Sequence, residues 1–296
     1  GQVGDVRYGI LSAFEDDVEW IGQTDDGSRV DVVGPGRDFA TARVIYESIG
    51  ESRKSIGYLG TLVQGPIYDA EVHSLDAHFV NPDGRVIIDS QFIYGGRDQE
   101  EGYGALIDMT YAKSSTLSHV VEIDYMDEDI NFNDLGFLAR NNYARLRYVM
   151  SFSKLDMGPS LSNYRTTLIA EQQYNLDDGL VTDSGLYWRS SIFLPRRQTL
   201  RMGVGYMPER FEDIDSRGNG SYQVDDRIWA DLVLATDSGR VASYSVGMGV
   251  LQEHLDDWTV NAKAGVTYRP VDWMSVDFDL DYRQRNGWLV YQGGRN

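Results

Sequence analysis

The stretch Met274-Ser275-Val276-Asp277-Phe278-Asp279-Leu280-Asp281-Tyr282-Arg283 alternates strictly between apolar and polar side chains. A period of two residues belongs to an extended strand, in which successive side chains point to opposite faces. One face of this segment is therefore wholly apolar, while the other carries serine, aspartates and an arginine. Such a long strand with one apolar face is typical of β-strands that cross a lipid bilayer.

The same alternation recurs along the whole chain. We count about sixteen segments of roughly 8–12 residues, the length of a tilted membrane strand and longer than most soluble strands. Many begin or end in Tyr or Trp, which predicts aromatic girdles at the lipid–water boundaries, although the general preference of aromatic residues for strands gives the same pattern. The segments are Tyr8–Phe14, Ala40–Tyr46, Ile56–Leu62, Ala70–Val80, Val86–Tyr94, Tyr103–Tyr111, Val121–Tyr125, Ala144–Ser153, Tyr164–Tyr174, Leu186–Leu194, Leu200–Tyr206, Ile228–Leu234, Ala242–Val250, Trp258–Tyr268, Met274–Arg283 and Trp288–Tyr291.

The connections alternate in length, as outer-membrane barrels do with short turns on the periplasmic side and long loops outside. The sequence therefore predicts an all-β fold, a transmembrane antiparallel up-and-down β-barrel of about 16 strands, in the outer membrane of a Gram-negative bacterium. We expect residues 1–296 to form one outer-membrane β-barrel domain that is a segment of a longer precursor. The long connections are Asp16–Arg37, Gly95–Glu101, Asp127–Asn142, Asn175–Thr182 and Pro208–Asp226.

Composition excludes several other classes of protein. Hydrophobic residues make up 42% of the chain and the mean hydropathy is −0.39, and no apolar run reaches the 18 or so residues of a spanning helix. The chain has no cysteine, which excludes disulfides and thiolate metal sites. Its formal net charge of −19 argues against nucleic acid as a partner, because phosphate binding needs a basic surface.

The polar positions of the strands supply candidates for the lining of a lumen, because Arg or Lys facing lipid near the midplane would cost about 2–4 kcal/mol. Two interpretations stay open: a cation-favouring passage with a basic patch on one wall, or charges that pair with one another and rigidify the barrel. Small residues at Gly203 and Gly205, and at Ser243, Ser245, Gly247 and Gly249, leave room for a plug or mark a tight strand bend. The lining candidates are Asp89, Asp108, Glu122, Asp124, Arg145, Arg147, Arg189, Arg201, Asp231, Lys263, Asp277, Asp279 and Asp281.

The long connection from Asp127 to Asn142 is too apolar for a freely solvated loop. It contains Phe132, Leu135, Phe137 and Leu138, so we expect it to pack against the inner wall as a constriction, or to act as a simple clamp at the rim. The residues that we expect to form the constriction are Phe132, Asn133, Gly136, Phe137 and Arg140.

Linear motifs for catalysis or metal binding are absent from the sequence. It contains no nucleophile elbow, phosphate-binding loop, His-Glu-x-x-His or EF-hand pattern, so we name no catalytic residue, metal ligand or cofactor. An enzyme whose site is assembled from several strands stays open, because such a site leaves no linear motif. Acidic doublets in the connections, such as Asp25-Asp26 and Asp225-Asp226, are explained by solvated charge, with calcium as the alternative.

Three stretches resemble one known family. They are Asp38–Val44, Lys54–Gly60 and Ile130–Asn142, and the last contains Phe132-Asn133-Asp134-Leu135-Gly136-Phe137-Leu138-Ala139-Arg140. In this order they resemble the bacterial DUF5916 family, mainly over residues 1–155. The resemblance implies an outer-membrane barrel that follows a carbohydrate-binding-module-like domain, and it implies no catalytic residues.

We rank three functions from the sequence. The first is a porin-like channel that transports small solutes, with saccharides as one class, since about sixteen strands leave a water-filled bore if nothing plugs it. The second is a plugged structural barrel that anchors a partner protein or a periplasmic module, and the third is a barrel enzyme at the outer mouth. In each case outer-membrane lipid is a partner. A soluble β-sandwich or adhesin repeat is the alternative fold, and it requires the apolar rows to pack in a dry core.

Overall fold

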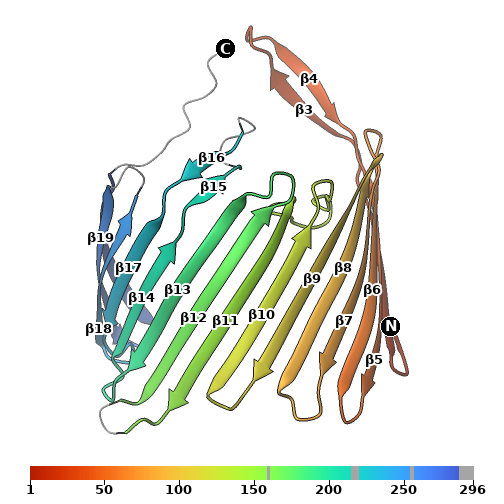
Figure 1. Cartoon of the computed structure of the whole chain (residues 1–296). Coiled ribbons are helices and arrows are strands. Elements are labelled where there is room, and N and C mark those ends of the chain that lie inside the picture. The colour runs from red at the N-terminus through yellow and green to blue at the C-terminus, as the bar shows by residue number, and fades with distance from the viewer. Residues whose placement is uncertain (159–160, 215–219, 254–256, 287–296) are drawn as a thin grey trace. The chain divides into compact units, whose positions relative to one another are not determined.

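The computed structural model describes residues 1–158, 161–214, 220–253 and 257–286. Figure 1 shows long strands that follow one another in chain order. Within these ranges there is no helix long and apolar enough to cross a membrane. The segment Trp288–Tyr291, which the sequence predicts to be a strand, lies outside the described residues.

Sixteen strands form one sheet in the order β1-β2-β5-β6-β7-β8-β9-β10-β11-β12-β13-β14-β17-β18-β19-β20. Apart from two inserted hairpins, neighbours in the sheet are neighbours in the chain, which is an up-and-down order. The predicted fold class, an all-β antiparallel up-and-down barrel sheet of about sixteen strands, is confirmed. The strands are β1 (Gln2–Val3), β2 (Val6–Phe14), β5 (Asp38–Ile49), β6 (Arg53–Gln64), β7 (Ala70–Val80), β8 (Val86–Arg97), β9 (Glu100–Ala112), β10 (Leu117–Met126), β11 (Tyr143–Leu155), β12 (Asn163–Asn175), β13 (Val181–Phe193), β14 (Thr199–Met207), β17 (Arg227–Ala235), β18 (Ala242–Gln252), β19 (Trp258–Val271) and β20 (Met274–Gln284).

Two of the predicted long loops contain hairpins of their own. Strands β3 (Val18–Gln23) and β4 (Arg29–Gly34) pair within the first connection. Strands β15 (Arg210–Glu212) and β16 (Tyr222–Val224) pair within the connection that precedes β17. The backbone groups of these connections are thus partly satisfied by short sheets rather than by water alone.

The prediction of a long connection at Gly95–Glu101 is wrong. Strand β8 continues to Arg97 and β9 begins at Glu100, which leaves only Asp98 and Gln99 between them. Asp98 has a φ of 55°, a left-handed conformation that aspartate tolerates in tight turns.

The chain divides into two compact units. Unit 1 comprises residues 1–110, 122–145 and 176–178, and unit 2 comprises residues 111–121, 146–175 and 179–296. In both units the alternation of the sequence gives the sheet one apolar and one polar face.

The apolar face is exposed. In unit 1 the side chains of Ile56 and Leu75 are 56% and 53% exposed, and in unit 2 those of Met248 and Phe278 are 65% and 66% exposed. Apolar side chains that packed into a dry core would be buried, so the alternative of a soluble β-sandwich is wrong. Apolar groups exposed along whole strands need a solvent that is itself apolar.

Aromatic and histidine rings form two stacks on this exposed face. In unit 1, His73 lies between Tyr58 and Tyr94, with ring centroids 6.0 and 5.9 Å away. In unit 2, His119 lies between Tyr111 and Tyr148, at 6.2 and 6.0 Å. Rings with a polar edge favour the lipid–water boundary. The girdles themselves stay a prediction.

Candidate functional site

The polar face of unit 1 carries an ion pair that spans three strands. Arg43 on β5 donates two hydrogen bonds to the carboxylate of Asp76 on β7, one of them from Nη2 to Oδ2 at 2.8 Å. The strand between them, β6, has Gly57 at this level, and a Cβ there would lie 2.7 Å from both side chains. The glycine therefore gives the bidentate pair its room.

A second group of paired charges in unit 1 joins β10 to β11. Arg145 contacts the carboxylate of Asp124, which is only 5% exposed, and lies 4.0 Å from Glu122 Oε2. These three residues are lining candidates that the structure brings together. Asp108, on the adjacent strand β9, lines a polar pocket of about 220 Å³ with Asp89.

Histidine and acid also meet in unit 1, which bears on the enzyme hypothesis. His78 Nδ1 and Asp89 Oδ1 are 2.5 Å apart, and Ser55 lies opposite His78 in the register of β6 and β7. No hydrogen bond joins Ser55 to His78 in the part of the chain that the structure describes. Ser55, His78 and Asp89 lie at the strand ends that are joined by short turns. The enzyme hypothesis places the active site at the opposite ends, where the long loops are.

The polar face of unit 2 contains paired charges as well. Arg147 Nε lies 3.3 Å from Glu171 Oε2, and Lys263 Nζ lies 3.6 Å from Asp281 Oδ1. Further along β19 and β20, Thr267 donates a hydrogen bond of 2.6 Å to Asp277. Asp279 lies opposite Gly265 in the register of β19 and β20.

Three arginines of unit 2 differ from these paired residues because their side chains have no charged partner among the residues that the structure describes. Arg189 and Arg201, both lining candidates, and Arg165, which the sequence analysis does not single out, are exposed. None of their three guanidinium groups forms an ion pair or a hydrogen bond within the described residues. The guanidinium carbon of Arg189 lies 5.7 Å from the ring centroid of Trp229. Asp231 lies across Gly203 from Arg189 and forms no ion pair with it.

The glycines beside these arginines correct one prediction. A Cβ on Gly203 would lie 2.8 Å from the ring of Trp229, and a Cβ on Gly205 would overlap that ring. The space that these glycines leave is therefore filled by Trp229 and, at Gly203, also by the carboxylate of Asp231. Trp229 stacks on Tyr187 at 6.3 Å between centroids. A plug or another chain is not needed to fill it.

The connection from Asp127 to Asn142, hereafter the 127–142 loop, joins β10 to β11 and lies on the polar face of unit 1. Ile130 is only 1% exposed and packs with Ile93 and Met126. A Cβ on Gly102 would overlap the backbone of Ile130, and one on Gly95 would lie 3.0 Å from Asn131 O. These two glycines let the loop backbone approach the strands closely.

The loop is fixed at its middle by Asp134. The hydroxyl of Tyr68 donates a hydrogen bond of 2.6 Å to Asp134 Oδ1, and Arg37 Nη1 lies 3.4 Å from the same oxygen. Arg97 in turn stacks on the ring of Tyr68 at 3.8 Å. We call Arg37, Tyr68 and Asp134 the latch.

The residues expected to form the constriction take different positions. Phe132 and Leu138 pack on the cluster around Ile130, whereas Phe137 is 84% exposed, so the expectation that Phe137 packs on the wall is wrong. Asn133 Oδ1 accepts a hydrogen bond of 2.6 Å from the backbone of Leu138 and closes the turn. Gly136 lies in that turn and Arg140, half-buried, follows it. Whether the loop narrows a passage stays a prediction.

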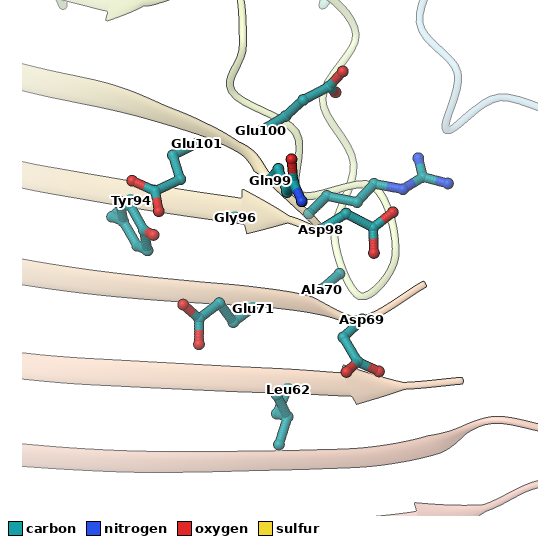
Figure 2. Close-up of a pocket in the computed structure, with 11 residues that line it drawn as sticks. Leu62, Asp69, Ala70, Glu71, Tyr94, Gly96, Asp98, Gln99, Glu100 and Glu101 are labelled. Carbon is teal, nitrogen blue, oxygen red and sulfur yellow. The ribbon is translucent and has the colours of Figure 1, made fainter. Parts of the chain in front are cut away.

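A larger pocket of about 910 Å³ lies elsewhere in unit 1, on the apolar side at the ends of β7, β8 and β9 (Figure 2). Its lining is acidic, with Glu71 and Glu101 on either side of Tyr94. Because these residues share the parity of the exposed apolar face, the pocket is not part of the polar face. No group of three or more His, Asp or Glu residues has the arrangement to hold a metal ion within the described ranges, and calcium in the loops stays a prediction.

Comparisons with known proteins place the sequence in a family. The model of a family described as a domain of unknown function, DUF5916, matches residues 52–294, which extends beyond the region 1–155 where the sequence stretches show the resemblance. A search of curated proteins gives no match.

Solved structures from Pseudomonas aeruginosa are similar in backbone path. OpdL has a TM-score of 0.48 at 9% identity, covering 95% of this chain and 94% of that chain. OpdQ has a TM-score of 0.47 at 8% identity, covering 96% and 94%. At such identities the similarity says nothing of what this chain binds or transports.

Proposed function

This chain belongs to the DUF5916 family, and from that premise we propose that it is an outer-membrane channel through which small polar solutes pass along the polar face of its sheet. Two properties of the sheet support the location. Its apolar rows are exposed along whole strands, as contact with acyl chains requires. The charge pairs of Arg43, Arg145, Arg147 and Lys263 lie on the opposite face, where water or a counter-charge can meet them.

The observation that carries the proposal is the placement of the 127–142 loop. A loop that served only to connect two strands would extend into solvent. This one buries Ile130 on the polar face over two glycines and is held there by the latch. An inward-folded loop narrows a bore and thereby selects solutes by size and charge, which a barrel that only anchors another domain has no need to do.

Planar-bilayer recordings of the purified protein test the proposal. We expect discrete conductance steps, and we expect Asp134→Ala to raise the conductance or its noise because the latch then lacks its acceptor. Asp25→Ala, which removes an exposed carboxylate from the β3–β4 hairpin, is the matched control and should leave the conductance unchanged.

The outcomes separate the hypotheses. A wild type that inserts but never conducts contradicts the channel and supports the plugged anchoring barrel. Conductance that is the same in wild type, in Asp134→Ala and after deletion of residues 131–142 contradicts the role of the loop. Liposome swelling with sugars of increasing size then measures the limit for uncharged solutes, and saccharides are one class within it.

A further inference from the structure

We propose that Arg165, Arg189 and Arg201 form a binding station for small oxyanions, above all carboxylates, on the polar face of unit 2. The inference rests on the proposed function, because it names a class of solute that the passage would hold. It adds Arg165 to the functional residues and gives the three arginines one shared task.

The register of three adjacent strands brings these arginines together. Arg165 on β12 lies directly opposite Ser191 on β13, and Ser191 lies directly opposite Arg201 on β14. Arg189 is two residues before Ser191 and therefore points to the same face, one row further along β13. Neighbouring strands are about 4.8 Å apart, so the backbone positions of Arg165 and Arg201 are separated by about 10 Å. Three long side chains can reach one small ligand across that span.

Four other cations of the polar face have an ionic partner, whereas these three have none in the part of the chain that the structure describes. The sequence has 46 acidic and 27 basic residues, so carboxylates are abundant enough to pair every cation. Arg43 and Arg145 in unit 1, and Arg147 and Lys263 in unit 2, all have such partners. The three arginines have none among the described residues, although like charges on adjacent strands repel one another. An arrangement of that kind is stabilised when an anion binds.

The surroundings favour an oxyanion over chloride. A guanidinium group donates two parallel hydrogen bonds that match the two oxygens of a carboxylate or phosphate. Ser191, between Arg165 and Arg201, is small and adds a hydroxyl donor. The flat ring of Trp229, next to Arg189, limits that side of the station. Arg196 and Arg197 in the turn after β13 add two further cations at the same end of the strands.

Binding can be measured without any assay of transport. Trp229 lies next to Arg189, so its fluorescence should respond when an anion binds. We expect sodium citrate to give a saturable change in the detergent-solubilised protein at constant ionic strength, and calorimetry to give the same affinity. The variant with Arg165→Gln, Arg189→Gln and Arg201→Gln should bind citrate at least about tenfold more weakly. Arg240→Gln, an arginine in an exposed turn, is the control and should bind as the wild type does.

The results bear separately on the two proposals. No saturable binding of citrate, or equal binding by the triple variant, would overturn the station. Sodium phosphate in a parallel titration shows which oxyanion is preferred, and a phosphate affinity above that of citrate would overturn the preference for carboxylates. If the protein binds citrate but conducts no current, the station is supported and the channel is contradicted. If it conducts current but binds no oxyanion, only the channel is supported.

Discussion

The two units use the charges of their polar face differently. In unit 1, Arg43 and Arg145 are neutralised by carboxylates, one of which, Asp124, is almost fully buried. In unit 2, Arg165, Arg189 and Arg201 are exposed and have no ionic partner in the described residues. Paired charges fix neighbouring strands to one another, whereas unpaired charges remain available to a solute. Unit 2 has paired charges as well, in Arg147–Glu171 and Lys263–Asp281, so the difference lies in these three arginines. Whether the polar-face charges line a passage stays a prediction.

Removing a partner in unit 1 should have the largest effect. Asp124→Ala leaves the Arg145 guanidinium without its close acceptor, and we expect a loss of about 2 kcal/mol in the free energy of unfolding. Urea unfolding in detergent micelles measures it. Arg189→Gln in unit 2 should change the same quantity by less than about 0.5 kcal/mol, as exposed substitutions usually do. Equal losses in the two variants would remove the distinction between the units.

Giving the unpaired arginines of unit 2 a carboxylate partner should have an intermediate effect. Ser191→Asp places a carboxylate between Arg165 and Arg201, where it can pair with either. We expect the reversal potential in a salt gradient to shift toward cation selectivity by more than with Ser191→Asn, which matches its size without the charge. If both variants show the same reversal potential, the charge of the arginines does not reach the permeating ions.

The smallest expected effect is on the free energy of unfolding, when one member of a like-charged pair in unit 1 is neutralised. A hydrogen bond with the Asp177 side chain, and then repulsion from Asp177 and Asp129, raise the pKa of Glu128 in the 127–142 loop above its ordinary value. The folded state therefore holds this proton more tightly than the unfolded state, so stability falls as pH rises from the ordinary carboxyl range through the raised pKa. Glu128→Gln should unfold at a higher urea concentration than the wild type at neutral pH, with the difference vanishing in acid. A difference that does not depend on pH would show that the pair is not titrating.

The sequence predicts the strands well because their signal is local. The alternation in Tyr103–Tyr111 and Met274–Arg283 depends only on which neighbours are apolar, and β9 and β20 follow it. The connection Gly95–Glu101 is mispredicted because Gly95 resembles a chain breaker. Its real role is to admit the backbone of Asn131, which no local pattern contains.

The candidate site is only partly visible in the sequence for a related reason. Which charge meets which partner depends on the register between strands and on the packing of loops. Arg165 becomes conspicuous only when it lies in one row with Ser191 and Arg201. The pair of Arg43 and Asp76 likewise depends on the strand between them having Gly57 at that level.

The most direct test of the account is whether successive residues of one strand alternate between lipid and water. The chain has no cysteine, so single cysteines can be placed at Ile107, Asp108, Met109 and Thr110 of β9 with no native thiol to react. In liposomes, a small water-soluble thiosulfonate reagent should modify the cysteines at 108 and 110 and spare those at 107 and 109. Equal modification of all four, or protection of 108 and 110 instead, would contradict the assignment of the apolar face to lipid.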